Sequence, residues 1–509
     1  MISRWFTSSI SMSTLEVPEE RLRKFKYRGK DASVQRRQQR AVSLQLREAK
    51  KDEQVFERRN ITSLSTDPAS REETIRVSLT LPEMISGMNA SDPESCFQAA
   101  QAARRILSEQ RNPPVKLMVK VGLIPRLVAF LRSSRAPCLQ FEAAWALTSI
   151  SAESSEQTHA VVEGGAVQAL VELLSSPHMN VCKHAVLALG NIAGDGPEFR
   201  DVVISSNAIP RLLALISSTT PVTFLQHITR TLSYLCQKEG LQPCQTAVKP
   251  TLSILSCLLW HRDSEVLCYT CRALSYLTEV CDGHIGQVVD ILVLPRLVEL
   301  MASSEFDILL PSLYTVGNIV KGTDGQTQTA IDVGMLGALP QLLLHPKSSV
   351  QKVAAWALGN VATGPPKHLQ QLIACNILPP LVTLLRNGHF QVQKDAVCAV
   401  ANFISGGTLD QMIQLIHSGV LELLVNLLII PDMNVVINVL DIIFLLLQAT
   451  MESLPELPEM ESLCVPIEER GGLDRIKALQ YHENRQIALT AQSIIENHFS
   501  ERVQIQGLS

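Results

Sequence analysis

The chain has 509 residues, of which 46% are hydrophobic, 18% are charged and 5% are aromatic, and its formal net charge is −4. A chain of this length seldom folds as one undivided globular domain, and its Leu, Ala and Val content without alternating β-branched runs favours an all-α repeat array. Because the sequence has no phosphate-binding loop with its Lys-Ser/Thr pair, no nucleophile motif and no His/carboxylate metal spacing, we expect neither an enzyme nor a cofactor.

The first 60 residues carry a basic excess. They hold 15 Lys and Arg against 8 Asp and Glu, a balance of +7, which leaves −11 for the other 449 residues. Residues 1–12 faintly resemble an organelle presequence, although Met12 offers an ordinary alternative start. An extended basic stretch covers residues 21–30, and residues 31–58, which lack Pro and Gly, predict a helix with a basic face. A solvated face, a nucleic-acid tail and a protein-binding arm are all compatible with this pattern, and the acidic remainder favours an arm that docks on it.

Residues 61–83 are predicted to be a flexible linker, residues 84–500 a repeat array and residues 501–509 a short tail. The array repeats one eight-residue pattern at a step of about 42 residues, clearest as AAWALGNV at residues 354–361. A second marker is a Gly or Asn that precedes the second helix of each unit and is often followed by Pro, as at Gly122, Gly164, Asn207, Gly334 and Asn376.

The recurring pattern places Trp356 and Asn360 one helical turn apart, on the side opposite an apolar stripe. In one interpretation the Trp packs against the next repeat. In the other, the indoles and carboxamides of successive repeats form a ladder along an inner groove. The carboxamides would then bind the backbone of an extended peptide, while the indoles flank the stems of its Lys or Arg side chains.

The twelve cysteines are predicted to be thiols at helical core positions, in a reducing cytosol or nucleus. Cys268 and Cys271 form a CxxC pair. Because no second pair lies at metal-ligand spacing, we expect these two cysteines to be buried thiols and not metal ligands. The richest apolar run, residues 435–447, is interrupted by Asn438 and Asp441, so we expect a buried helix and not a membrane span.

The three-helix repeat with this ladder, together with RLRKFKYRGKD, FEAAWALTSI, ALGNIAGDGPEFRD, GNIVKGTDGQTQ and GGLDRIKALQYHEN, resembles the importin alpha family of armadillo-repeat nuclear import adaptors over about residues 12–499. The resemblance implies an all-α superhelical solenoid of about ten three-helix units behind an N-terminal importin-beta-binding arm. It also implies shuttling between cytoplasm and nucleus. The implied partners are importin beta, cargo proteins with basic nuclear localisation signals, and an export receptor at the last repeats.

The resemblance assigns three sets of residues. Importin beta would contact the basic residues of the arm, namely Arg21, Arg23, Lys24, Lys26, Arg28, Lys30, Arg36, Arg37, Arg40, Arg47, Lys50 and Lys51. The N-terminal cargo groove would comprise Trp145, Ser149, Thr158, Leu187, Asn191, Asp195, Arg230 and Tyr234, with Asp195 pairing with a cargo lysine. The C-terminal cargo groove would comprise Tyr314, Asn318, Val320, Thr327, Trp356, Asn360, Asp395 and Asn402, with Asp395 standing where the family has Glu.

The chain departs from the family at several of these positions. Each groove keeps one indole, since Trp145 is followed in the ladder by Leu187, and Trp356 by Cys398. Three missing contacts in the N-terminal groove predict a loss of roughly 2–4 kcal/mol in cargo binding. At the end of the arm, where the family has a basic cluster that imitates cargo, only Arg58 and Arg59 remain after Glu57, so we expect weak self-inhibition.

Two other functions fit parts of the sequence. A regulatory decoy would bind importin beta through the arm and transport little cargo. A scaffold of the beta-catenin kind would have a basic groove and would not bind importin beta.

Overall fold

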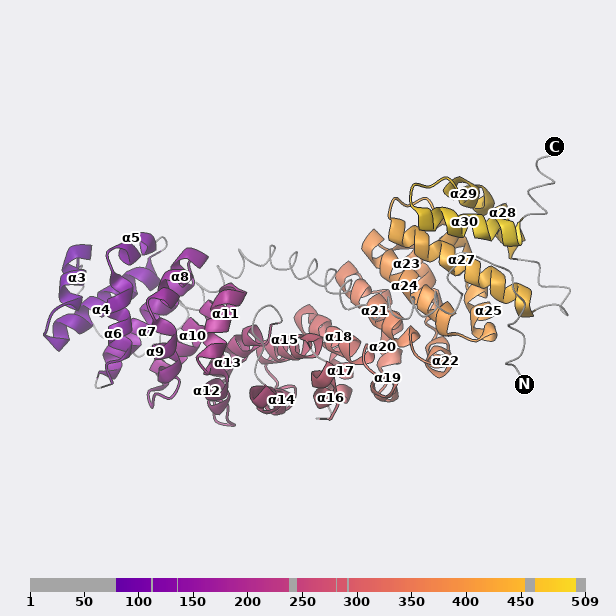
Figure 1. Cartoon of the computed structure of the whole chain (residues 1–509). Helices are drawn as coiled ribbons and strands as arrows, with labels where there is room; N and C mark the ends of the chain where they lie inside the picture. Colours follow the sequence, from indigo (N-terminus) through magenta and orange to yellow (C-terminus); the bar gives the residue numbers. More distant parts are fainter. Residues whose placement is uncertain are drawn as a thin grey trace. The chain divides into compact units, whose positions relative to one another are not determined.

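The computed structural model describes residues 79–110, 113–134, 136–237, 245–280, 282–290, 293–453 and 463–499, and all regular structure in these ranges is α-helical (Figure 1). The described helices form two compact units. The N-terminal unit ends at Asn318 and the C-terminal unit begins at Ile319, so the boundary lies within α18 (Phe306–Val320). The prediction of an all-α chain is confirmed, and the first helix in the described ranges begins at Leu81.

The helices follow one another as repeats of a short first helix, a short second helix and a longer third helix. The first helices are α5 (Val115–Lys120), α8 (Ser155–Glu163), α11 (Pro197–Ser205), α16 (Asp282–Asp290), α19 (Asp324–Asp332), α22 (Pro366–Ala374), α25 (Leu409–His417) and α28 (Cys464–Glu469). The second helices are α3 (Leu81–Met88), α6 (Leu123–Leu131), α9 (Ala166–Leu173), α12 (Ala208–Ala214), α14 (Gln245–Leu258), α17 (Leu294–Leu300), α20 (Met335–Leu343), α23 (Leu378–Asn387), α26 (Val420–Leu427) and α29 (Gly472–Leu479). The third helices are α4 (Pro93–Glu109), α7 (Pro137–Ser151), α10 (Met179–Asp195), α13 (Val222–Leu235), α15 (Ser264–Val280), α18, α21 (Ser348–Ala362), α24 (Phe390–Gly406), α27 (Met433–Ser453) and α30 (Arg485–His498).

The turn before the second helix has a left-handed residue in most repeats. Gly122, Asn207 and Gly334 have φ values of 87°, 60° and 91° and immediately precede α6, α12 and α20. Before α9 the left-handed residue is Gly165, at φ 75°. Gly164, which the sequence pattern indicated, lies one position earlier, at the end of α8. Such backbone angles favour Gly and Asn, which explains why these residue types mark the turn in the sequence.

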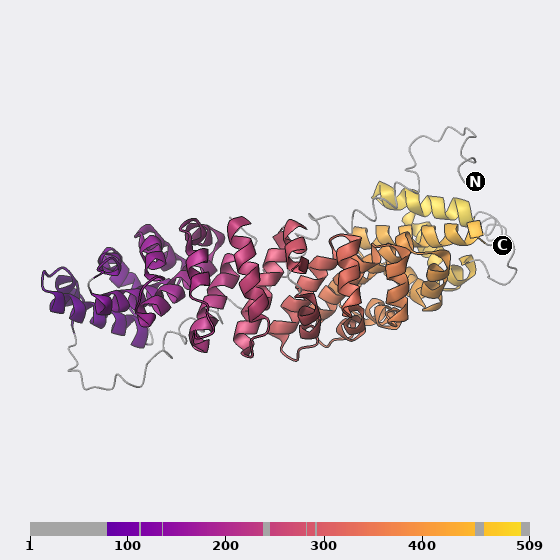
Figure 2. The ribbon, with the colours of Figure 1, turned by 90° about the horizontal axis from the view of Figure 1, so that it is seen from below.

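Third helices pack against the third helices of neighbouring repeats. In the N-terminal unit α4 packs on α7, α7 on α10, α10 on α13 and α13 on α15, and in the C-terminal unit α21 packs on α24, α24 on α27 and α27 on α30. Figure 2 shows the helices of the N-terminal unit side by side in chain order, from indigo to pink. In the interior of each unit a third helix therefore lies between two others, as α7, α10, α13, α24 and α27 do, and its side chains are positioned by residues about 40 positions away in sequence.

The cysteine prediction is correct only in part. No disulfide joins the described cysteines to one another, and several lie in the core, including Cys271 on α15. However, Cys138, Cys257 and Cys398 are exposed. The apolar run within α27 is a largely buried helix, as predicted. In the part of the chain that the structure describes, no helix alone has the length and apolar composition to cross a bilayer. Only α22 and α23 together, with a bend of 84° between them, pass that test.

Candidate peptide-binding grooves

The recurring Trp position and the Asn position four residues later define two columns of side chains on the third helices, which we name the Trp column and the Asn column. The structure extends both by one repeat, because Arg104 and Ser108 of α4 occupy these positions before α7. The Trp column reads Arg104, Trp145, Leu187, Arg230, Arg272, Tyr314, Trp356 and Cys398. The Asn column reads Ser108, Ser149, Asn191, Tyr234, Tyr276, Asn318, Asn360 and Asn402. Sequence reasoning missed the first pair, although the 41-residue step back from Trp145 indicates it.

Carboxamides of the Asn column connect neighbouring third helices. In each case Nδ2 donates to the backbone carbonyl that precedes the Asn-column residue of the previous helix: Asn191 to Thr148 at 3.1 Å, Asn318 to Ser275 at 3.2 Å and Asn402 to Gly359 at 2.9 Å. An asparagine side chain has two N–H donors and one acceptor oxygen. These residues therefore stabilise the repeat stack. Within the described ranges, Asn191 and Asn402 each have a second N–H and a carbonyl oxygen that can bind a peptide. Nδ2 of Asn318 also lies 3.1 Å from Oγ1 of Thr278, to which it donates.

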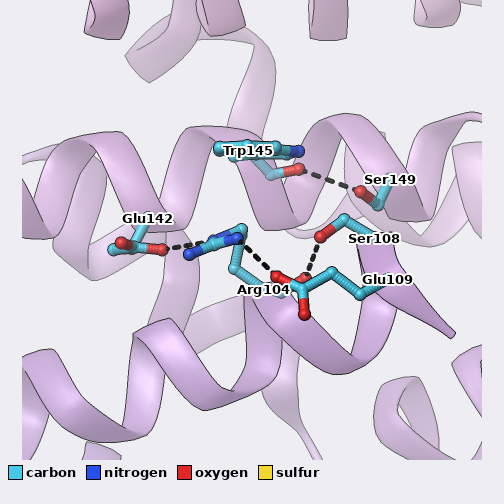
Figure 3. A network of polar contacts seen from close by, with 6 residues as sticks. All are labelled: Arg104, Ser108, Glu109, Glu142, Trp145 and Ser149. Carbon is cyan, nitrogen blue, oxygen red and sulfur yellow. Dashed lines mark hydrogen bonds and ion pairs between the residues drawn. The ribbon is translucent and has the colours of Figure 1, made fainter. Parts of the chain in front are cut away.

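The indole of Trp145 is covered by side chains of both neighbouring helices. The guanidinium of Arg104 lies 4.5 Å from the ring centroid, and Figure 3 shows it beneath the indole. The imidazole of His184 stacks on the same indole with a centroid distance of 4.6 Å and an interplanar angle of 16°. The indole is only 6% exposed as a result, and its Nε1 has no hydrogen-bond partner among the described residues.

The charges around this indole are balanced within the unit. Nε of Arg104 donates to Glu142 Oε2 at 2.7 Å, in an ion pair whose two side chains are nearly buried. Burial lowers the pKa of His184 to about 3, with smaller contributions from Lys183, His227 and Arg104, so the imidazole is neutral at pH 7. Trp145 thus already has a cation against its π system, supplied by the preceding repeat.

The two serines of the Asn column turn back to their own helices. Ser108 Oγ donates to the carbonyl of Arg104 at 2.8 Å, and Ser149 Oγ donates to the carbonyl of Trp145 at 3.3 Å (Figure 3). Their hydroxyls are therefore engaged within α4 and α7.

Two predicted groove threonines have the same buried environment. Thr158 is fully buried and its hydroxyl donates to the carbonyls of Ser151 and Ser154, both at 3.2 Å. Thr327 is nearly buried, and its hydroxyl donates to the carbonyls of Val320 and Thr323, both at 3.1 Å. Both hydroxyls hold the turn between a third helix and the next first helix.

Asp195 is the last residue of α10, one turn after Asn191, and it is half-buried. A helix C-terminus carries a partial negative charge. The carboxylate adds to that charge, so this end of α10 favours a cation.

In the centre of the N-terminal unit, the columns hold arginine and tyrosine. Arg230 Nε donates to Tyr234 Oη at 3.2 Å on α13. On α15 the guanidinium of Arg272 lies 5.5 Å from the ring centroid of Tyr269. No indole or asparagine occupies the columns on these two helices.

The C-terminal unit presents a different environment. Trp356 is partly exposed on α21, and Asn360 lies one turn further on. Asp395 of α24 is 8% exposed, and its Oδ2 has no hydrogen-bond partner among the described residues. Burial raises the pKa of this carboxyl to about 7, while Lys352 and Lys394 act in the opposite direction. Asp395 therefore lies near the midpoint of its titration at neutral pH.

The predicted arm residues, from Arg21 to Lys51 together with Arg58 and Arg59, lie outside the residues that the structure describes. Within the described ranges no cluster of His, Cys, Asp and Glu could hold a metal ion.

Family models match most of the chain. An importin beta binding domain matches residues 21–101, and armadillo/beta-catenin-like repeats match residues 111–152, 154–194, 196–237, 323–363 and 365–405. An atypical Arm repeat matches residues 461–507. The armadillo/beta-catenin-like repeat matches include Trp145, Asn191, Trp356 and Asn402.

Individual proteins agree with these matches. The crystal structure of an engineered protein from the Northeast Structural Genomics Consortium has a TM-score of 0.72 and 27% identity, over 82% of this chain and 98% of that chain. Importin subunit alpha-1b of Oryza sativa subsp. japonica is 43% identical over 242 residues, which are 48% of this chain and 45% of that protein. Importin subunit alpha-8 of Mus musculus is 52% identical over 490 residues, which are 96% of this chain and 97% of that protein. The chain belongs to the importin alpha family of armadillo-repeat nuclear import adaptors, which are not enzymes.

Proposed function

We propose that this chain is a nuclear import adaptor with two unequal cargo grooves. The C-terminal groove, around Trp356, Asn360 and Asn402, holds basic segments of cargo. The N-terminal groove, around Trp145 and Asn191, binds them more weakly. The basic arm binds importin beta, the chain shuttles between cytoplasm and nucleus, and the last repeats contact an export receptor.

The expected difference in cargo affinity between the two grooves rests on one observation. A cargo lysine that stacks on Trp145 would have to displace Arg104 or His184, and displacing Arg104 would also leave the nearly buried Glu142 without its ion pair. Breaking a buried pair costs several kcal/mol. Since a cation on an indole contributes only about 0.5–2 kcal/mol, the exchange is unfavourable. Trp356 is partly exposed and has a carboxamide one turn away, so a lysine can reach it more easily.

The test is a calorimetric titration of a peptide with one basic cluster into the wild-type protein and into Trp356→Ala and Trp145→Ala. We expect Trp356→Ala to weaken binding by about three- to thirtyfold, and Trp145→Ala to change it less than twofold. A larger loss from Trp145→Ala in a folded protein would contradict the proposal.

The arm is tested separately. Removing residues 1–60 should change affinity for the same peptide by less than threefold and should abolish capture of importin beta. A tenfold gain in peptide affinity would contradict weak self-inhibition.

The regulatory decoy is the second candidate, because the N-terminal groove has lost its accessible indole. It predicts that importin beta binds while neither groove binds a basic peptide, and the same two measurements separate it from the adaptor.

A further inference from the structure

The centre of the N-terminal unit has a chemical character opposite to that of a lysine groove. Two neighbouring third helices, α13 and α15, place Arg230 and Arg272 in the Trp column and Tyr234 and Tyr276 in the Asn column. Tyr269 lies on α15 beside them. We name these five residues the Arg/Tyr cluster.

The members of the Arg/Tyr cluster lie close to one another. Arg230 donates from Nε to Tyr234 Oη at 3.2 Å and lies 5.8 Å from the centroid of that ring. Arg272 lies 5.5 Å from the ring centroid of Tyr269. Burial raises the pKa of Tyr269, and the positive charges of Arg230 and Arg272 both act to lower it, as expected when both guanidiniums lie near this phenol.

These contacts hold the guanidiniums in place. Stacking on an aromatic ring and a bond to a phenol fix the orientation of a guanidinium. Two like charges on adjacent helices repel each other in a partly buried environment. An anion that contacts both would relieve this repulsion, and guanidinium groups bind carboxylate and phosphate oxygens through paired hydrogen bonds.

An acidic side chain already contacts one end of the cluster. Asp307 of α18 approaches Arg272 with a distance of 3.4 Å from Oδ1 to the guanidinium. Asp307 is 54% exposed and the side chain of Arg272 is 19% exposed, so this ion pair is accessible to solvent. Because an exposed pair of this length contributes little, an incoming anion can replace it. The contact also shows that a carboxylate can reach this guanidinium.

We infer that the Arg/Tyr cluster is a binding subsite for an anionic side chain, a carboxylate or a phosphate, on a peptide whose basic residues lie in the neighbouring part of the groove. This inference rests on the proposed function, since it places the peptide along the same columns. An anionic subsite at this position makes the N-terminal unit selective for peptides that carry both basic and acidic side chains. The binding that is lost at Trp145 is then partly replaced by contacts that a purely basic peptide cannot make.

The test uses the full chain and a fluorescent peptide that contains one cluster of basic residues. On either side of that cluster, one position at a time is Ala, Glu or phosphoserine, and affinity is measured by fluorescence anisotropy. At one or more positions we expect Glu or phosphoserine to strengthen binding about three- to tenfold over Ala. The Glu and phosphoserine peptides distinguish a carboxylate from a phosphate ligand.

Three variants locate the effect. The double variant Arg230→Gln/Arg272→Gln should abolish the preference for Glu or phosphoserine over Ala, and its thermal unfolding shows whether the protein is folded. Arg211→Gln is the matched control, since it removes one positive charge from α12, outside both columns, and should preserve the preference. Asp307→Asn should increase the preference, because it removes the internal competitor for Arg272.

The outcomes are distinct. Equal binding of the Ala, Glu and phosphoserine peptides at every position would overturn the anionic subsite and leave the adaptor function intact. Failure of all three peptides to bind the wild-type protein would overturn the adaptor function, and with it this inference. A preference that persists in the double variant would also refute the assignment to Arg230 and Arg272.

Discussion

The two tryptophans of the Trp column have nearly the same sequence around them and different environments. Trp145 occurs in AAWALTSI and Trp356 in AAWALGNV. The neighbours of Trp145 place a guanidinium and an imidazole against its ring, whereas Trp356 keeps exposed surface. The comparison teaches that a repeat motif specifies where a side chain points, and that the adjacent repeats decide whether it is available to a ligand.

The largest predicted effect is the loss of unfolding free energy when each indole is deleted. Trp145→Ala removes a ring packed between Arg104 and His184, so we expect the unit to lose about 3–5 kcal/mol of unfolding free energy. Trp356→Ala should cost less than half as much, because its ring is partly exposed. Differential scanning calorimetry of both variants makes the comparison. Equal losses would show that the two rings are equally structural.

A second difference concerns charge in the C-terminal unit. The pKa of Asp395 is raised by burial to about 7, so its ionised form destabilises the folded chain, and stability is lost as pH rises from about 4 to 7. Asp395→Asn should therefore leave stability unchanged near pH 4 and increase it at pH 8, by on the order of 2–4 kcal/mol.

Thermal unfolding between pH 4 and pH 8 measures the effect of Asp395→Asn. The control is Asp432→Asn, which removes the carboxylate that Lys394 contacts at 2.7 Å and should lower stability at pH 8. A destabilising effect of Asp395→Asn at pH 8 would rule out a buried, unfavourable carboxylate.

The glycines before Asn191 and Asn360 give a matched pair of substitutions. A Cβ on Gly190 would lie 2.5 Å from Thr231 Oγ1, whereas a Cβ on Gly359 would meet nothing closer than 3.7 Å. Gly190→Ala should therefore destabilise the packing of α10 on α13 by about 1–3 kcal/mol. Gly359→Ala should be neutral or stabilising by up to about 1 kcal/mol, because Ala is the better helix former. Denaturant unfolding of both variants would test this, and equal effects would contradict the close approach at Gly190.

The smallest effect should come from restoring a carboxamide at position 149. Ser149→Asn replaces a hydroxyl that is bonded to its own helix with a side chain that has spare donors and an acceptor. We expect peptide affinity to increase about two- to tenfold, from a net hydrogen-bond contribution of about 0.5–1.5 kcal/mol. Trp145→Ala should not abolish this gain, since the carboxamide would act on the peptide backbone. An unchanged titration curve would mean that peptide affinity in this groove is limited by the covered indole of Trp145 and not by the missing carboxamide.

The sequence by itself determined the period, the all-helical class and the turns with left-handed Gly or Asn. These properties depend on residues within one helix or one turn, where backbone geometry fixes which side chains share a face. It also placed Trp and Asn in two columns, and the family matches agree with the resemblance drawn from those motifs.

Only the tertiary structure decided what each column residue contacts. Arg104 and His184 reach Trp145 from repeats on either side of it, Asn191 bonds to a carbonyl 43 residues earlier, and burial moves the pKa of Asp395. These properties depend on how helices from successive repeats pack and on how much water they exclude. Periodicity within one helix therefore cannot predict them.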